Sequence, residues 1–435
     1  MNNNMKKNTF LLALSALMSL SAVAENQPFL TKVYDFMPAP GQFVNTLPAF
    51  NAGDTKADVL ARVAEDICGY YDVEDGDSTM VYKPAMISLG SYGGYVVVGF
   101  DHPVVNVKGD YDFQIFGNAF LSNQYGSGGS SEPGIVMVSY DANGNGLPDD
   151  PWYELAGSEY KSPKTQHNYT ITYYKPDENK VKTPDPNNKS IIDNTYIRWT
   201  SNDVNPDSIS GYVYKNSFHA QSYWPQWAEG ETITFTGSKL CNNATDVSGK
   251  GTYWVQWNKG WGYVDNRPDY DPYSPRTDLD PAVMNRGFKI DWAVDANGVP
   301  VHLPMVHFIK VYNAVNQYCG WLGETSTEVA GGIDFHPNQA LPEVTAGDTN
   351  GDGIVDVSDV TAVINFILGQ KQAGYNPVAV DVNGDTVVDV SDVTTVVNFI
   401  LGQKQEGYNP VAVDVNGDTV VDVTDVTALI NLILK

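Results

Sequence analysis

The C-terminal part of the chain carries three acidic loops in which oxygen-bearing side chains recur at alternating positions. The first begins "DTNGDGIVDVSDV" at Asp348, and two near-copies begin at Asp381 and Asp414, at equal intervals. Ca²⁺ binds roughly six to eight oxygen ligands, and a calcium loop supplies them from positions 1, 3, 5, 7, 9 and 12, with a backbone carbonyl at position 7. The spacing therefore predicts one calcium site in each loop.

The predicted ligands occupy the same positions in all three loops. They are Asp348, Asn350, Asp352, Ile354, Asp356 and Asp359 in the first loop, Asp381, Asn383, Asp385, Val387, Asp389 and Asp392 in the second, and Asp414, Asn416, Asp418, Val420, Asp422 and Asp425 in the third. Position 12 is Asp in each loop, so the closing ligand is one methylene shorter than the Glu of an EF-hand.

The sixth position of the loop distinguishes the three sites. Gly353 in the first loop adopts positive φ freely, whereas Thr386 and Thr419 are β-branched and should each lose about 1–2 kcal/mol in that conformation. We therefore expect the first loop to bind Ca²⁺ most tightly. A calcium titration that finds three equal sites, or a tightest second site, would contradict this prediction.

Each loop leads into one amphipathic helix. In the first repeat the apolar stripe comprises Val360, Val363, Ile364, Ile367 and Leu368, and both other repeats reproduce it. The segment "GYNPVAV" enters the second and third loops without a preceding helix. A unit this small cannot bury its stripe alone, so the repeats must pack on one another with the help of Ca²⁺.

These repeats resemble the dockerin family, on the strength of "DTNGDGIVDVSDVTAVINFIL", "DVNGDTVVDVSDVTTVVNFIL" and "DVNGDTVVDVTDVTALINLIL". The resemblance implies a small all-α calcium-binding domain over residues 348–435 that attaches its carrier to a cohesin-like domain. Two departures from the family pattern are three repeats instead of two, and Val-Ser or Val-Thr at positions 10 and 11. The alternative is a calcium-stiffened stalk without a cohesin partner.

Charge and the N-terminus indicate an exported protein. The net charge of −26 argues against nucleic acid and anionic membranes as partners. Lys6 and Lys7 precede an apolar run that ends near Ala22-Val23-Ala24, which predicts a signal peptide over residues 1–24. No other stretch is long and apolar enough to predict a transmembrane segment. We expect the mature protein to be secreted or at the cell surface.

Residues 25–337 are predicted to form one mainly β domain. The predicted strands lie at 94–100, 112–120, 133–140, 232–237, 253–257 and 306–315, whereas only 54–67 reads as a helix, with Asp54 as its N-cap. Many short strands separated by turns favour a large, jelly-roll-like β-sandwich. The polar stretch 338–347 is predicted to be a linker.

The three cysteines, Cys68, Cys241 and Cys319, leave two interpretations open. One disulfide with a spare thiol is compatible with export, but the sequence does not select the pair. The alternative is that all three are buried as small hydrophobic residues.

A fourth acidic loop interrupts the large domain directly after a predicted strand. "DANGNGLPDDPW" offers Asp141, Asn143, Asn145, the Leu147 carbonyl and Asp149 or Asp150, with Gly146 at position 6. This pattern predicts a structural calcium clip. The alternative is a plain Asn-Gly turn.

Two aromatic segments, 222–230 and 252–268, are the candidate ligand-binding region. Trp224, Trp227, Trp261 and Tyr263 lie among Gly, Pro and Asn residues, where rings can be exposed for stacking on sugars. The alternative for any one of them is a place in the core.

Catalytic signals are weak, and no catalytic residue is predicted. The six histidines show no metal-binding spacing, and no nucleophile motif is present. Glu132 and Asp265 are possible partners in the carboxylate pair of an O-glycosyl hydrolase, although the sequence does not bring them together.

The large domain also resembles secreted β-sandwich cell-surface proteins of gut bacteria. The resemblance rests on "VVVGFDHPVVNVKGDYDFQIFGNAF", "SSEPGIVMVSYDANGNGLPDDPWYELAGSEY", "GTYWVQW", "KIDWAVDANG" and "FIKVYNAVNQYCGWLGETSTEV". It implies capture of an extracellular ligand. The leading hypothesis is a polysaccharide-binding domain assembled through the calcium-binding tail. A polysaccharide-degrading glycoside hydrolase and a nutrient-capture protein, for example for a corrinoid, are the alternatives.

Overall fold

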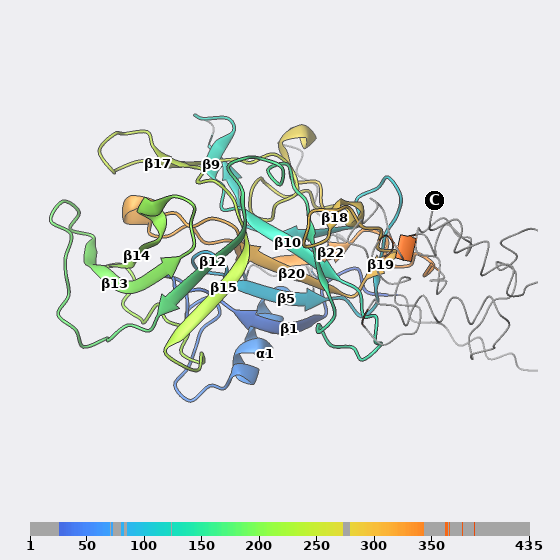
Figure 1. The fold of residues 1–435 in the computed structure, drawn as a ribbon, viewed down its shortest axis with the longest axis horizontal. Helices are drawn as coiled ribbons and strands as arrows, with labels where there is room; N and C mark the ends of the chain where they lie inside the picture. The colour runs from blue at the N-terminus through green and yellow to red at the C-terminus, as the bar shows by residue number, and fades with distance from the viewer. Residues whose placement is uncertain are drawn as a thin grey trace, which may run out of the picture.

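The computed structural model describes residues 26–69, 71–72, 80–81, 85–122, 124–272 and 279–342, and the isolated positions 362, 363, 365, 376 and 387 (Figure 1). The predicted signal peptide lies outside these residues. So do all the predicted calcium ligands of the repeats except Val387, and with them the predicted all-α fold of the tail.

The described part of the chain is mainly β, as predicted, and its centre is a six-stranded antiparallel sheet in the order β1-β5-β20-β10-β11-β18. The strands are β1 (Lys32–Met37), β5 (Tyr95–Gly99), β20 (Phe308–Asn313), β10 (Gly134–Ser139), β11 (Trp152–Leu155) and β18 (Ala293–Val294). The apolar runs at 94–100, 133–140 and 306–315 thus become the three adjacent strands β5, β10 and β20 in the middle of the sheet. Their side chains alternate between two buried faces, because neighbouring residues of a strand point to opposite sides.

A second, four-stranded sheet packs on one face of the central sheet in the order β14-β13-β12-β15. Its strands are β14 (Ser210–Asn216), β13 (Ile191–Ser201), β12 (Gln166–Tyr174) and β15 (Thr232–Lys239), drawn in green to yellow-green in Figure 1. Tyr95 and Tyr312 of the central sheet join Tyr169, Ile171 and other residues of this sheet in one core cluster. The core between the two sheets is therefore rich in tyrosine, which explains why the domain is so aromatic.

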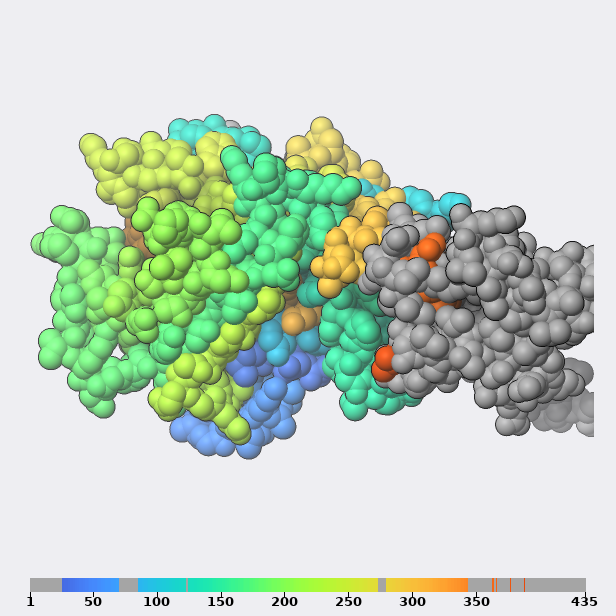
Figure 2. All heavy atoms as spheres, in the orientation of Figure 1, coloured from blue at the N-terminus to red at the C-terminus, as the bar shows by residue number. Residues whose placement is uncertain are grey.

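The opposite face of the central sheet is covered by the helix α1 (Lys56–Ile67), at the lower edge of the space-filling view (Figure 2). The predicted helix is thus confirmed, but Asp54 is not its N-cap. Thr55 caps it, since the Thr55 hydroxyl accepts from the Asp58 backbone N–H while the Asp58 carboxylate accepts from the Thr55 N–H. Asp54 instead forms an ion pair with Arg62.

Smaller elements complete the fold around the central sheet. A third sheet has the order β16-β17-β9-β8, and four further strand pairs are β19-β6, β2-β3, β21-β4 and β22-β7. Their bounds are β2 (Tyr71–Asp72), β3 (Met80–Val81), β4 (Ile87–Ser88), β6 (Val104–Val105), β7 (Phe113–Phe116), β8 (Phe120–Leu121), β9 (Gly128–Ser130), β16 (Ala244–Asp246), β17 (Trp254–Trp257), β19 (Met305–Val306), β21 (Glu328–Val329) and β22 (Gly331–Asp334), with 3₁₀ helices η1 (Pro206–Ser208), η2 (Pro281–Val283), η3 (Ile290–Trp292) and η4 (Gly320–Leu322).

The first and last segments of the domain lie side by side. The Asn26 side chain donates to the Pro337 carbonyl at 2.7 Å, and the Asn26 backbone N–H donates to the Asn338 side chain at 3.3 Å. Among the described residues, no helix has the length and apolarity needed to cross a membrane.

No disulfide joins the three cysteines to one another. Cys68 and Cys241 are half-buried and Cys319 is buried. The Cys241 sulfur lies 3.0 Å from the Lys259 ammonium group, and the Cys319 sulfur lies 3.5 Å from the Thr325 hydroxyl. The cysteines therefore serve as small packing residues.

Candidate functional site

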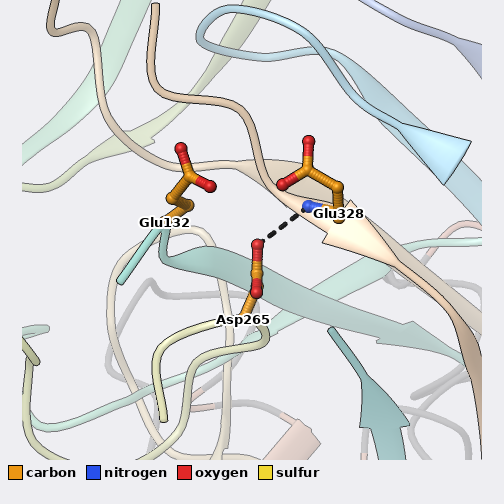
Figure 3. Close-up of side chains that lie close together, drawn as sticks. All are labelled: Glu132, Asp265 and Glu328. Atoms are coloured by element: carbon orange, nitrogen blue, oxygen red, sulfur yellow. Dashed lines mark hydrogen bonds between the residues drawn. The ribbon is translucent and has the colours of Figure 1, made fainter. Parts of the chain in front are cut away.

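Three carboxylates from distant parts of the chain meet inside the large domain. Glu132 lies between β9 and β10, Asp265 follows β17, and Glu328 begins β21. One carboxyl oxygen of each lies within 4.8 Å of the others, and Figure 3 shows the three side chains converging. Glu132 and Asp265, which the sequence analysis considered as a pair, are thus brought together, and Glu328 joins them.

Asp265 holds this acidic cluster (Glu132, Asp265 and Glu328) together. Its backbone carbonyl accepts from the Glu132 N–H at 2.8 Å, and its carboxylate accepts from the Glu328 N–H at 2.9 Å (Figure 3). The second carboxylate oxygen accepts from the Asn118 N–H at 2.8 Å. Asp265 has a φ of 53°, in the left-handed region that few residues other than glycine adopt. Such strain at a residue that fixes two other carboxylates is typical of a functional site.

Close packing around Asp265 depends on a glycine. A Cβ placed on Gly117 would lie 2.6 Å from both the Cβ and a carboxylate oxygen of Asp265. Any side chain at position 117 would therefore displace Asp265 and, through it, the other two members of the acidic cluster.

Glu132 and a fourth acid, Glu324, face the same space from two sides. One Glu132 oxygen accepts from the Gln256 side chain at 3.0 Å and from the Ser326 N–H at 3.3 Å. One Glu324 oxygen accepts from the Gln42 N–H at 2.5 Å. Hydrogen bonds from neutral groups orient these carboxylates, but they do not neutralise their charge.

Burial and mutual repulsion favour the protonated forms of these groups. Burial, followed by the charges of Glu132 and Asp265, raises the pKa of Glu328 well above its usual value. Burial, followed by the charge of Glu132, does the same to the pKa of Asp265, and burial also raises the pKa of Glu132. Burial raises the pKa of Glu324 to about 8. Without a cation, the site therefore retains protons at neutral pH.

The acidic cluster forms the floor of a cavity of about 580 Å³ beside the third sheet. Glu132, Glu324 and Glu328 line it, whereas Asp265 lies beneath. Its lining is largely apolar and includes the aromatic rings of Phe43, Phe120, Phe218, Tyr253, Trp254 and Trp321. Phe120 and Phe218, 58% and 62% exposed, contribute to the wall as accessible rings. An aromatic wall above a few polar groups is the usual composition of a small-molecule site.

Three buried polar atoms of the residues that line the cavity have no hydrogen-bond partner. They are one carboxylate oxygen each of Glu324 and Glu328 and the indole nitrogen of Trp254. Buried polar groups are nearly always hydrogen-bonded, because desolvation without compensation costs about 1–3 kcal/mol each. A ligand with hydroxyl groups could satisfy all three atoms, and a cation could satisfy the two carboxylate oxygens.

The four aromatic residues predicted to bind a ligand lie in different places. Trp224 and Tyr263 are 1% and 2% exposed and belong to the tyrosine-rich core. Trp227 is half-buried against Phe36 and Phe50. Only Trp261 is exposed, beside Trp292 in a separate cavity of about 340 Å³. The Gly-rich and Pro-rich segments around these residues indicate turns, but the four side chains lie in different parts of the domain.

The predicted calcium loop at 141–150 has its oxygen atoms turned inward. The Asp141 carboxylate accepts from the N–H groups of Asn145 and Gly146 at 3.0 and 2.9 Å, and the Asn145 side chain accepts from the Leu147 N–H at 2.7 Å. Gly146 has a φ of 73°, as position 6 requires. One oxygen of Asp150, a residue 6% exposed, is buried without a partner.

Several residues of the cavity escaped the sequence analysis. Glu324 and Glu328 lie in "GETSTEVAGGIDF", where an isolated acid in an extended segment resembles a solvent-facing residue of an edge strand. The sequence offered one signal for Glu328, which is followed directly by small and apolar residues in "EVAGGI". Such a context indicates a buried strand, and a buried acid normally has a partner or a ligand. Trp321 lies in the short 3₁₀ helix η4 and Phe218 in a short loop after β14, and neither gave a comparable signal.

Comparison with known proteins identifies the tail. The model of the dockerin type I domain family matches residues 346–401 and again residues 379–434. Each match contains two consecutive acidic loops, and both contain the middle one. The C-terminal repeats therefore belong to the dockerin type I family, as the sequence analysis predicted. No curated protein matches the chain significantly.

The match shows that the protein carries a dockerin type I region at residues 346–434. Dockerin type I domains in general bind calcium and cohesin partners, and proteins that carry them are typically extracellular or at the cell surface. The family assignment covers the tail alone.

Proposed function

We propose that residues 25–337 form an extracellular carbohydrate-binding domain, exported by the signal peptide and attached to a cohesin-bearing partner through the linker 338–347 and the repeats. The single observation that carries this proposal is the cavity with aromatic rings, whose lining residues include three carboxylic acids and three buried polar atoms without a partner. Aromatic rings stack on the apolar faces of sugars, and carboxylates accept hydrogen bonds from sugar hydroxyls. An extracellular polysaccharide offers both features along one chain.

Two tryptophans provide a matched test of where the ligand binds. Trp321, 39% exposed, lines the aromatic cavity, and Trp261, 50% exposed, lines the separate one. In a binding screen of the full-length protein against polysaccharides, Trp321→Ala should weaken binding of the selected glycan about 10- to 100-fold, as truncation of a stacking ring does. Trp261→Ala should change it less than about twofold.

The opposite pattern would move the site to the cavity of Trp261 and Trp292. Absence of binding to every polysaccharide would contradict the proposal itself. Isothermal titration calorimetry on the selected glycan gives the affinities, and the thermal unfolding of both variants controls for loss of fold.

A second candidate function, glycoside hydrolysis, is favoured by one specific observation. Glu132 and Glu328 both line the cavity, and one carboxyl oxygen of each lies within 4.8 Å of the other, so the two acids could act as the carboxylate pair that glycoside hydrolysis needs. A reducing-sugar assay on the bound glycan decides between the two functions. Sugar release that disappears in Glu132→Gln or Asp265→Asn would establish the hydrolase.

We also propose calcium as the ligand of the loop 141–150. Asp141, Asn143, Asn145, Leu147, Asp149 and Asp150 would supply the oxygens. The unpartnered oxygen of Asp150 supports this proposal, because a bound cation would satisfy it.

A further inference from the structure

We propose that the acidic cluster of Glu132, Asp265 and Glu328 binds a calcium ion whose open coordination positions face the aromatic cavity and take hydroxyl oxygens of the bound carbohydrate. This inference rests on the proposed function, since it names how the same cavity recognises its ligand.

Charge is the first argument for a cation at this place. Three carboxyl groups share a space in which their oxygens lie within 4.8 Å, and Asp265 and Glu328 are 0% and 3% exposed. In the described part of the chain, no ion pair with Lys, Arg or His involves them or Glu324. Buried carboxylates are normally paired or bound to a metal. A divalent cation would offset the repulsion between these three closely spaced carboxylates.

The unpartnered oxygens are the second, independent argument. Glu324 is 7% exposed and lies outside the acidic cluster, yet it faces the same cavity and one of its oxygens has no partner. One Glu328 oxygen is likewise buried without a partner. Buried carboxylate oxygens without a partner beside such a cluster would be satisfied by a cation, or by water bound to it.

The chemistry of the donors selects a hard cation. All three groups offer oxygen, and the nearby Cys319 thiol has its pKa raised by burial to about 12, so that no thiolate is available. Oxygen-only donor sets suit Ca²⁺, which accepts about six to eight oxygens in variable geometry. Three carboxylates would occupy only some of the coordination positions of the ion. We expect the remaining positions to face the cavity.

The backbone holds the donors in place before any ion arrives. The Asp265 carboxylate is fixed by the N–H groups of Asn118 and Glu328, and Glu132 is fixed by Gln256 and Ser326. A preorganised donor set binds a metal more tightly than one that must be ordered. The ion would then bridge the protein to vicinal sugar hydroxyls in the cavity.

The test uses the full-length protein and its tryptophan fluorescence, because all nine tryptophans lie between Trp152 and Trp321 and none lies in the repeats. At pH 7.5, calcium at about a hundredfold excess over its Kd should raise the thermal midpoint of this signal by roughly 5 °C relative to chelator. Glu328→Gln should remove the part of the calcium shift that the acidic cluster provides, so that Glu328→Gln combined with Asp149→Asn should show no shift. The midpoint in chelator should not fall, because the uncharged amide resembles a protonated carboxyl group.

Three control variants make the outcome specific. Glu229→Gln removes an exposed acid and should retain the full shift. Asp149→Asn removes a proposed ligand of the loop 141–150 and should retain the part of the shift that the acidic cluster provides. If Asp149→Asn loses the shift while Glu328→Gln keeps it, the loop is responsible and the inference is overturned. Glu132→Gln repeats the test on a second ligand should Glu328→Gln fail to unfold cooperatively.

A glycan-binding assay distinguishes failure of the calcium site from failure of the proposed function on which it rests. Chelator should abolish binding of the selected glycan, and calcium should restore it. Glycan binding that survives chelator but is lost in Trp321→Ala would refute the calcium site and leave the proposed function intact. A calcium shift without binding of any glycan would support the calcium site and contradict the proposed carbohydrate-binding function.

Discussion

Removing calcium from the full-length protein is expected to unfold the C-terminal repeats and leave the β domain folded. Each repeat is predicted from the sequence to comprise one acidic loop and one short amphipathic helix, and neither would bury enough apolar surface to fold alone. Without the ion, we expect the carboxylates of each loop to repel one another and the predicted helix to unfold. Metal binding free energy in such small domains is folding free energy, so the expected effect is complete loss of the repeat structure.

Two optical signals separate the two domains in a single sample. Circular dichroism at 222 nm should lose the helical contribution of the repeats, while tryptophan fluorescence, which arises entirely from the β domain, should keep its folded spectrum at 25 °C. Calcium, but not magnesium, should restore the helical signal, because Mg²⁺ is reluctant to lose its waters. Retention of helical structure in chelator, or loss of the folded fluorescence spectrum, would contradict the prediction.

Raising the pH from 5 to 8 in chelator is expected to lower the stability of the β domain. Burial raises the pKa of Glu324 from 4.5 to about 8, and those of Asp112, Asp269 and Glu154 to about 7. Between the unfolded and folded pKa values the native state holds more protons than the unfolded state. Stability is therefore greatest below pH 4.5 for these groups and falls as the pH rises through their folded pKa values.

The expected size of this pH effect is large relative to a typical folding free energy. One pKa unit corresponds to about 1.4 kcal/mol, so Glu324 alone contributes on the order of a few kcal/mol, against a typical total of about 5–15 kcal/mol. Thermal midpoints followed by tryptophan fluorescence at half-unit pH steps measure the slope. Glu324→Gln should flatten it between pH 5 and 8, and the exposed Glu229→Gln should not. A midpoint that rises with pH would refute the assignment.

The sequence indicated the strands of the central sheet better than those of the sheet packed on it. The strands β5, β10 and β20 are apolar runs that are buried on both faces, and such runs are visible without any partner. The long strand β12 alternates tyrosine or isoleucine with threonine over Tyr169–Tyr173, and β13 mixes apolar and polar residues without a regular alternation. The apolar side chains of these two strands can be recognised as buried only when the central sheet that covers them is known.

The site was less predictable because its residues are assembled by the fold. Glu132 and Asp265 could be singled out as acids next to a proline and an arginine, but their meeting depends on the carbonyl of Asp265 and its positive φ. Whether a tryptophan in a Gly-rich segment is exposed depends on distant elements. Trp224 is buried against the tyrosine-rich core, whereas Trp321 reaches the cavity.

The pairing of the two ends of the β domain has a practical consequence. Asn26 binds the backbone and side chain of the segment 337–338, so the chain enters and leaves the domain at one point. A domain with adjoining ends can be inserted into a surface loop of an unrelated host without stretching either protein. Residues 26–338 are therefore suited to insertion into another protein. The inserted domain would carry the aromatic cavity without the dockerin repeats.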